Sequence, residues 1–167
     1  PEKQKAERSL HEFIKQAWHV IEPKRAFIDN WHIASICDHL QAVTEGHIRD
    51  LLINVPPGCM KSLLCNVCWP AWEWGPKGRP YTGWLHTSYA YDLTIRDARK
   101  CRDLINSSWY QSQWPIRFAD DQNRKGRFAN TDGGWRFSTS VGGQTTGEHP
   151  SRIVVDDPHN ATGIRSD

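Results

Sequence analysis

The sequence has no long apolar run and no strong excess of charge of either sign. No segment reaches the roughly 18 consecutive apolar residues of a membrane-spanning helix, so no transmembrane segment is expected. The polar N-terminus also lacks the apolar core of a secretion signal. The net charge of +2 is too small to predict nucleic-acid binding from composition. The composition is that of a soluble globular protein, and 167 residues suffice for one domain with a substantial core.

Cysteine is present, but its number and spacing do not predict a metal site. The five cysteines are an odd number, and Cys65 and Cys68 form a single C-x-x-C pair. A structural zinc site needs four ligands, and no second pair completes one. We therefore interpret the cysteines as reduced, partly buried thiols of an intracellular protein, with zinc binding or redox chemistry as the alternative.

The most informative segment comprises residues 54–62, which read Asn54-Val55-Pro56-Pro57-Gly58-Cys59-Met60-Lys61-Ser62. We call it the lysine loop. It follows an apolar run at residues 51–53 and precedes a segment that can be helical. A strand, a tight loop, a Lys-Ser pair and a helix are typical of a phosphate-binding loop. In such a loop backbone N–H groups surround the anion, the lysine reaches the terminal phosphates and the serine hydroxyl binds Mg²⁺.

The lysine loop departs from the usual phosphate-loop pattern at two positions. Val55 and Met60 stand where glycine is expected, six residues before the lysine and directly before it. The alternative interpretation is a Pro-Gly turn that carries an ordinary exposed lysine. The predicted nucleotide-binding residues are Pro57, Gly58, Cys59, Met60, Lys61 and Ser62.

A second segment, residues 152–158, is a short β-branched run that ends in two carboxylates. Its apolar residues do not alternate with polar ones, which predicts a parallel strand buried on both faces. Asp156 and Asp157 then lie at the carboxyl edge, where open α/β sheets bind ligands. Asp156 could hold Mg²⁺, and Asp157 could orient or deprotonate an attacking water. The alternative is an acidic turn, but together with Lys61 the pair favours a nucleoside triphosphate site.

The order of elements predicts an α/β fold with a mainly parallel sheet flanked by helices. Residues 1–48 form a helical segment that leads into a core at residues 49–167. A hairpin around an Asp-Gly turn precedes the last strand, and residues 120–127 read as a solvated loop, with a phosphate contact as the alternative. Helices are expected at residues 9–20, 30–44, 62–74 and 89–105. Strands are expected at residues 51–55, 82–87, 126–130, 135–141 and 152–156.

These motifs, in this order, resemble the large terminase subunits of tailed bacteriophages, the motor proteins that pump DNA into capsids. The resemblance covers roughly residues 27–160, and its segments taken together are fairly specific. Besides the lysine loop they are Pro70-Ala71-Trp72-Glu73-Trp74, Ser88-Tyr89, Trp114-Pro115, Thr139-Ser140-Val141-Gly142-Gly143, Thr146-Gly147 and Ile153-Val154-Val155-Asp156-Asp157-Pro158.

The resemblance implies a P-loop NTPase of the ASCE (RecA-like) group that hydrolyses ATP with Mg²⁺. Lys61 and Ser62 match the phosphate- and metal-binding pair, and Asp156 matches the metal-binding acid. Asp157 stands at the position of the catalytic carboxylate, which is often the longer glutamate. Implied partners are double-stranded DNA, a small terminase subunit and the capsid portal protein, with a homo-oligomeric ring in the host-cell cytoplasm and no membrane. Alternatives are a helicase-like DNA translocase and a nucleotide-binding remnant without turnover.

Two functional groups of the family have no clear match here. Many relatives carry an arginine finger where this chain has Thr146, so Arg136 or Arg152 is a candidate substitute. Adenine contacts in the family come from the segment before the lysine loop, which contains Phe27, Trp31 and His32. The alternative for these three residues is core packing.

The resemblance also implies features that do not follow Asp167, namely a coupling motif, nuclease carboxylates and a C-terminal domain. In this fold group the next strand inserts between the lysine-loop strand and the acidic strand, and a nuclease domain comes later. The chain is therefore expected to be an ATPase domain that is incomplete at its C-terminus, without the nuclease domain. As such it is expected to be a poor ATPase that neither packages nor cleaves DNA.

Overall fold

The computed structural model describes residues 1–119, 126–143, 145 and 147–159, and within them it has an α/β fold. Four strands form one open sheet in the order β2-β3-β1-β4. The central strand β1 (Gly83–Ser88) is parallel to β3 (Trp135–Ser140) and to β4 (Arg152–Asp156), and β2 (Arg127–Ala129) is antiparallel to β3. The predicted fold class, a mainly parallel sheet with helices, is confirmed, and so is the hairpin. Most of the expected 120–127 loop, namely residues 120–125, lies outside the described residues.

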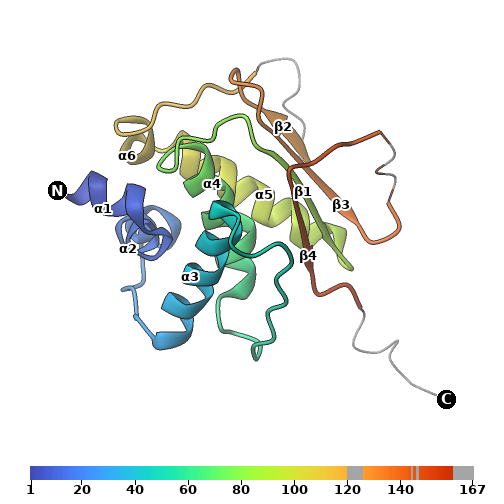
Figure 1. The fold of residues 1–167 in the computed structure, drawn as a ribbon, viewed down its shortest axis with the longest axis horizontal. Helices are drawn as coiled ribbons and strands as arrows, with labels where there is room; N and C mark the ends of the chain where they lie inside the picture. The colour runs from blue at the N-terminus through green and yellow to red at the C-terminus, as the bar shows by residue number, and fades with distance from the viewer. Residues whose placement is uncertain (120–125, 144, 146, 160–167) are drawn as a thin grey trace.

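The helices lie mainly to one side of the sheet, and α5 packs directly against β1 and β3 (Figure 1). The predicted helices at 9–20, 30–44, 62–74 and 89–105 are all present with slightly shifted ends. A short N-terminal helix was not expected, because it buries only Ala6 and so has little apolar periodicity. The helical elements are α1 (Glu2–Arg8), α2 (Leu10–Ile21), α3 (Trp31–Glu45), η1 (Leu63–Cys68), α4 (Trp69–Trp74), α5 (Tyr91–Asn106) and α6 (Ser108–Gln111).

Capping residues account for the helix ends that the sequence predicted. The Ser9 hydroxyl accepts the backbone N–H of Glu12 at 3.3 Å and so starts α2. At the start of α3 the side-chain oxygen of Asn30 accepts the backbone N–H of the next residue, Trp31, at 2.8 Å. Gly46 ends α3 with φ 83°, a left-handed conformation that glycine adopts without a Cβ clash.

The helix that follows the lysine loop begins with a π-helical section, η1, and continues as α4. The N–H of Trp69 bonds the carbonyl of Leu64, five residues back, instead of four. Pro70 lies within this helix, which runs on to Trp74. Pro70 has no N–H, so the carbonyl of Asn66, four residues earlier, lacks the α-helical donor that residue 70 would supply. That carbonyl accepts a hydrogen bond from Nη1 of Arg136 on β3.

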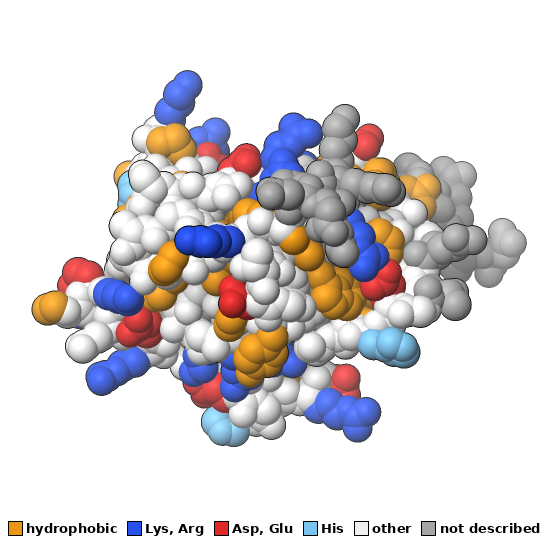
Figure 2. All heavy atoms as spheres, turned by 90° about the horizontal axis from the view of Figure 1, so that it is seen from above, with side chains coloured by type: hydrophobic (Ala, Val, Ile, Leu, Met, Phe, Trp, Pro, Cys, Tyr) orange, Lys and Arg blue, Asp and Glu red, His pale blue; other side chains and the backbone are white. Residues whose placement is uncertain are grey.

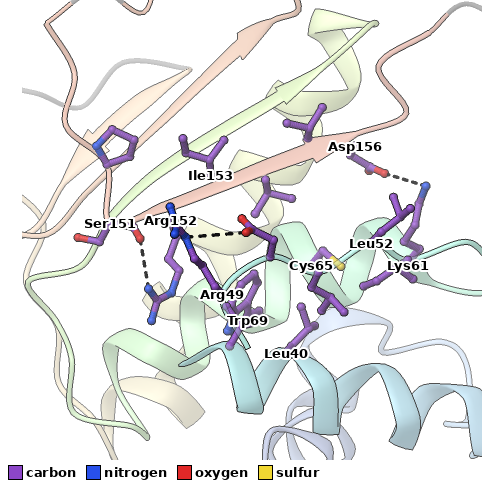
Figure 3. A pocket seen from close by; sticks show the side chains of 17 residues that line it. Leu40, Arg49, Leu52, Lys61, Cys65, Trp69, Ser151, Arg152, Ile153 and Asp156 are labelled. Atoms are coloured by element: carbon purple, nitrogen blue, oxygen red, sulfur yellow. Dashed lines mark hydrogen bonds and ion pairs between the residues drawn. The ribbon is translucent and has the colours of Figure 1, made fainter. Parts of the chain in front are cut away.

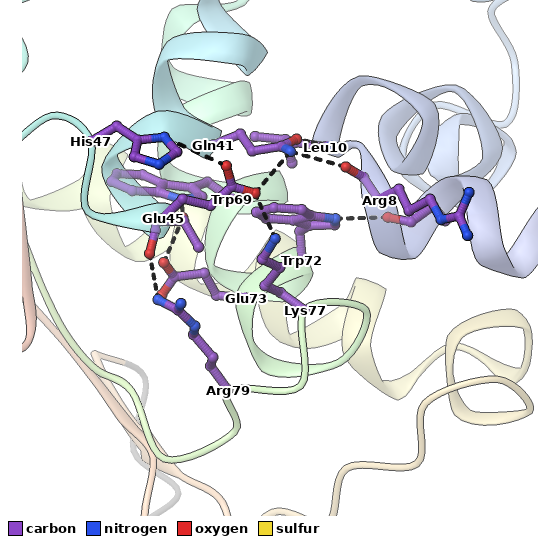
Figure 4. Close-up of polar contacts among 12 residues, drawn as sticks. Arg8, Leu10, Gln41, Glu45, His47, Trp69, Trp72, Glu73, Lys77 and Arg79 are labelled. Atoms are coloured by element: carbon purple, nitrogen blue, oxygen red, sulfur yellow. Dashed lines mark hydrogen bonds and ion pairs between the residues drawn. The ribbon is translucent and has the colours of Figure 1, made fainter.

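A buried carboxylate joins α3, α4 and β4. Glu73 is fully buried, and its Oε1 accepts hydrogen bonds from Thr44 at 2.6 Å and from Nε of Arg152 at 3.2 Å. Figure 4 draws the polar contacts around it, in which Arg79 donates to the Thr44 carbonyl and Trp72 to a backbone carbonyl of α1. These bonds fix the first residue of β4 to the helical layer.

The strand β4 lies at the edge of the sheet, which corrects the prediction of a strand buried on both faces. Val154 packs against the helical core, but Ile153 and Val155 are 62% and 54% exposed. The apolar run predicted a buried strand, yet burial on both faces requires neighbours that a run of residues cannot specify. Within the described residues β4 pairs with β1 alone.

The expected strand at residues 51–55 is also wrong, because this segment is irregular in the structure. It has the apolar composition of a strand, but a strand exists only where a neighbour completes its hydrogen bonds. Leu52 is 84% exposed, whereas Leu51 and Ile53 are partly buried against the core. The segment runs beside the free edge of β4 without pairing with it.

The surface carries mixed charge. On the face shown in Figure 2, basic side chains are interspersed with acidic and hydrophobic ones and do not form one continuous area. This agrees with the small net charge of +2. Among the residues that the structure describes, no helix is both long and apolar enough to cross a membrane.

Candidate functional site

The lysine loop turns tightly before the helix begins. The N–H of Cys59 reaches the carbonyl of Pro56 at 3.4 Å, and the N–H of Leu64 bonds the carbonyl of Met60 at 3.0 Å. Gly58 has φ 87° and Met60 has φ 62°, both in the left-handed region. A methionine rarely adopts this conformation, and glycine adopts it freely. Met60 therefore takes the backbone conformation that a glycine at this position would allow, although the sequence departs from the phosphate-loop pattern here.

The structure brings Lys61 together with both predicted carboxylates. Its Nζ lies 2.5 Å from Oδ1 of Asp157 and 3.3 Å from Oδ1 of Asp156. Lys61 and Asp157 are 96 positions apart in the sequence. Lys61 comes from the end of the lysine loop, whereas the carboxylates come from the carboxyl end of β4 and the residue after it. The lysine loop and the acidic segment at residues 152–158, which the sequence linked only through the types of their residues, therefore meet at one edge of the sheet.

Lys61 stays cationic in this environment. Partial burial opposes its charged form, but the hydrogen bond to Asp157 and the charge of Asp156 outweigh burial, so the pKa of Lys61 is raised above its usual value. The side chain of Lys61 is 23% exposed, so solvent still reaches it. A charged, accessible ammonium group can exchange its carboxylate partners for another anion.

The two carboxylates differ in burial and in backbone conformation. The side chain of Asp156 is 12% exposed, and that of Asp157 is 73% exposed. Asp157 has φ 44°, and among the described residues only Met60 and Asp157 combine a positive φ with a side chain. Such strained residues cluster at functional sites. Met60 directly precedes Lys61, and Asp157 is one of the two carboxylates that Lys61 contacts. Both strained residues therefore lie at this site.

A trough of about 620 Å³ extends from this contact along the free edge of β4. Lys61 and Asp156 lie at one end and Arg49 and Arg152 at the other, as Figure 3 shows. The opposite wall includes the irregular segment at residues 50–53, and Cys65 and Trp69 also line the trough. The end of the trough that contains Lys61 combines positive charge with oxygen ligands.

The two predicted ligands for a hard cation such as Mg²⁺ are Ser62 and Asp156, of which Asp156 lines the trough. Ser62, the residue after Lys61, offers a hydroxyl, and Asp156 offers a carboxylate oxygen. Among the described residues no group of three or more His, Cys, Asp or Glu side chains could hold a metal ion. This is compatible with Mg²⁺, which is bound by one or two protein oxygens together with phosphates and water. No described contact links the Ser62 hydroxyl to Asp156.

Several buried polar residues behind the site were not predicted from the sequence. Asn66, His86 and Asp97 are 3%, 1% and 4% exposed and are hydrogen-bonded to one another through Asn66. Asn66 also donates to Asp156 at 2.9 Å. The signal in the sequence was a single asparagine, Asn66, in an otherwise apolar helical segment. A buried amide needs hydrogen-bond partners, so such a residue indicates buried polar neighbours.

Neither candidate for the arginine finger is free to act as one in this structure. Arg136 is fully buried on β3 and bonds the backbone of η1. Arg152 is paired with the buried Glu73 at 3.1 Å. Thr146, which stands at the arginine position, lies outside the described residues.

The three residues considered for adenine contacts are spread around the start of α3. Phe27 packs against Trp18, with ring centroids 5.2 Å apart, which agrees with core packing. Trp31 is 80% exposed and makes an edge contact with His32. None of the three lines the trough.

The cysteines carry no metal site in the part of the chain that the structure describes. Cys37, Cys65, Cys68 and Cys101 are buried as free thiols, and Cys59 is partly buried in the lysine loop. Burial raises the pKa of Cys37 and of Cys65 to about 12, so both stay protonated at neutral pH. Partly buried thiols were predicted; Cys59 agrees with this, and the other four thiols are more completely buried.

Comparisons with known proteins do not assign a function to this site. Comparisons of the chain with protein-family models, with curated proteins and with solved structures found no match. Any function assigned to this site therefore depends on its own residues, above all on the contact of Lys61 with Asp156 and Asp157.

Proposed function

We propose that this chain binds ATP with Mg²⁺ and is the nucleotide-binding part of a protein that hydrolyses ATP, as a P-loop NTPase of the ASCE (RecA-like) group. The observation that carries the proposal is the contact of Lys61 with Asp156 and Asp157 at the carboxyl edge of a parallel sheet. This is the edge at which open α/β sheets bind ligands. The left-handed backbone conformation of Met60 also supports the interpretation of the lysine loop as a phosphate-binding loop.

In the proposed site each residue has a separate task. Lys61 exchanges its carboxylate partners for the terminal phosphates, and the backbone N–H groups of residues 58–62 surround them. Ser62 and Asp156 would hold Mg²⁺, which would supply charge neutralisation to the phosphates. The exposed Asp157 accepts a proton from the attacking water or orients that water. Because phosphoryl transfer depends on positioning and electrostatics, these are tasks that the reaction class requires.

The wider role that we propose is that of the ATPase part of a viral DNA-packaging motor. Its support is the series of terminase-like segments, from the lysine loop to residues 153–158. Its partners would be double-stranded DNA, a small terminase subunit and a capsid portal protein, in a homo-oligomeric ring in the host-cell cytoplasm. A helicase-like translocase would share the nucleotide site but not the response to a small terminase subunit or portal.

The test of the nucleotide site is calorimetric titration with a non-hydrolysable ATP analogue and Mg²⁺. Loss of a charge-assisted hydrogen bond costs on the order of 1.5–3 kcal/mol, so Lys61→Ala should weaken binding about tenfold or more. Lys77→Ala is the matched control, because Lys77 is equally exposed at 23% and is ion-paired with Glu45 at 2.7 Å. Equal affinity of Lys61→Ala and wild type would refute the proposed site.

Turnover is measured separately from binding, because a nucleotide-binding remnant would retain the first without the second. Phosphate release is followed with and without double-stranded DNA, a small terminase subunit and portal protein. Turnover that rises with the small subunit or portal favours the packaging role, and turnover that rises with DNA alone favours another translocase.

A further inference from the structure

A buried amide holds the Asp156 carboxylate from behind the candidate site. Asn66 lies in the π-helical section η1 and is 3% exposed. Its Nδ2 donates to Oδ2 of Asp156 at 2.9 Å, while the other oxygen of Asp156 faces Nζ of Lys61 at 3.3 Å. One oxygen of the carboxylate is thus bound to the protein interior, and the other is turned towards the lysine loop.

The orientation of the Asn66 amide is determined by its other contacts. Its Nδ2 also donates to Oδ2 of Asp97 at 3.1 Å, so both amide hydrogens point at carboxylates. Its Oδ1 lies 3.1 Å from Nδ1 of His86, which must be the donor in this pair. A flipped amide would turn its oxygen towards two carboxylates, which is electrostatically unfavourable. Burial, aided by the nearby charge of Arg136, lowers the pKa of His86 well below its usual value, so the imidazole is neutral at neutral pH.

The backbone of Asn66 is held as firmly as its side chain. Its carbonyl, which Pro70 leaves without the α-helical donor, accepts a hydrogen bond from the fully buried Arg136. Asn66 is therefore bonded to β1 through His86, to β3 through Arg136 and to β4 through Asp156. Single π-helical turns inside helices are frequently found at functional sites. Here the π-helical section contains Asn66, which is hydrogen-bonded to residues of all three parallel strands.

We propose that Asn66 is a positioning residue, which holds Asp156 so that its second oxygen is presented to a divalent cation. This inference rests on the proposed function. When the cation displaces Lys61 from Asp156, the bond from Asn66 to the other oxygen remains, and the carboxylate does not have to be reoriented. Groups that orient a metal ligand in this way typically contribute 10- to 100-fold to metal affinity.

The experiment measures how tightly the full chain binds Mn²⁺ in the presence of a non-hydrolysable ATP analogue, by electron paramagnetic resonance. Mn²⁺ replaces Mg²⁺ as the observable cation. Asn66→Ala should weaken Mn²⁺ binding about 10- to 100-fold, and affinity for the analogue in EDTA should stay within about twofold. Asn66→Asp, which keeps the shape but loses the donor, should weaken Mn²⁺ binding at least as much.

Two controls separate positioning from general damage to the fold. Val67→Ala removes buried atoms from the next residue, which has no described bond to Asp156, and should leave Mn²⁺ affinity unchanged. In an Asp156→Asn background, Asn66→Ala should have little further effect on Mn²⁺ affinity, because the group that it orients is already altered. Urea unfolding of each variant gives the folded fraction, by which the affinities are corrected.

The outcomes distinguish this inference from the proposed function. If wild type binds Mn²⁺ and the analogue but Asn66→Ala binds Mn²⁺ equally well, the positioning role is wrong and the nucleotide site stands. If Asn66→Ala weakens Mn²⁺ binding equally in both backgrounds, Asn66 does not act through Asp156. If wild type binds no analogue, the proposed function fails and this inference fails with it.

Discussion

At the scale of single residues, Met60 is the clearest conflict between side chain and backbone. Its φ of 62° costs a residue with a Cβ about 1–2 kcal/mol, whereas glycine pays only its greater unfolded-state entropy. We therefore expect Met60→Gly to be more stable than Met60→Ala by about 1 kcal/mol, the reverse of the order in an ordinary helix. Both variants lose the same side chain, so urea unfolding of the two isolates the backbone effect. An alanine variant as stable as the glycine variant would contradict the left-handed conformation.

The two carboxylates allow a second prediction at the residue scale. Asp156→Asn should weaken binding of the ATP analogue in Mg²⁺ but not in EDTA, because an amide is a poorer ligand for a hard cation. Asp157→Asn should not weaken binding in either condition, because Asp157 is proposed to act on water and competes with phosphate for Lys61. Asp157→Asn should instead lower the rate of phosphate release. Paired titrations with and without Mg²⁺ check the first difference, and equal effects of the two variants would contradict the assignment.

At the scale of elements, the strand β4 combines an exposed apolar face with a free edge. Ile153 and Val155 are more than half exposed, and β1 is the only described strand that pairs with β4. Free edges of this kind pair with other chains, and an edge lysine prevents such pairing. Ile153→Lys should therefore reduce aggregation, seen by light scattering, while the urea midpoint stays nearly unchanged. The matched control is Val154→Lys, which places a charge on the face of β4 that packs against the core and should lower the midpoint.

At the scale of the whole molecule, the buried thiols predict alkaline instability. The folded protein raises the pKa of Cys37 and Cys65 to about 12 from a value of 9.0, and burial also raises the pKa of Cys68 and Cys101. Above pH 9 the unfolded chain therefore binds fewer protons than the folded chain. The stability contribution is fully present below the unfolded pKa and is lost as the pH rises towards the folded pKa.

Cys37 and Cys65 should each remove about 1.4 kcal/mol from the free energy of unfolding between about pH 8 and pH 10. Cys37→Ala should flatten this dependence by the contribution of one thiol, as measured by urea unfolding at both pH values. Val67→Ala, which removes buried atoms but no titrating group, should lower stability equally at the two pH values. A Cys37→Ala variant with the wild-type pH dependence would contradict the role of this thiol.

Local patterns in the sequence determined the fold class, most helices and the hairpin. Ser9, Asn30 and Gly46 mark helix ends through bonds to their own neighbours, so a reader of the sequence can find them. The same is true of the lysine loop and the Asp156–Asp157 pair as candidate residues, because their types and order suggest their chemistry. Whether these residues hydrolyse ATP is not determined by the pattern and stays a proposal.

Only the tertiary structure decided how the chain's distant parts meet. The 51–55 segment and β4 were both predicted as strands, but pairing depends on neighbours, so the first is irregular and the second is an exposed edge. The contact of Lys61 with Asp157 spans 96 positions, and no local pattern specifies it. In the sequence Asn66 is a single polar residue in a helix, and only the packing shows that His86 and Asp156 are its hydrogen-bond partners. A side chain's partners are set by long-range packing, whereas its local conformation is set largely by the residues beside it.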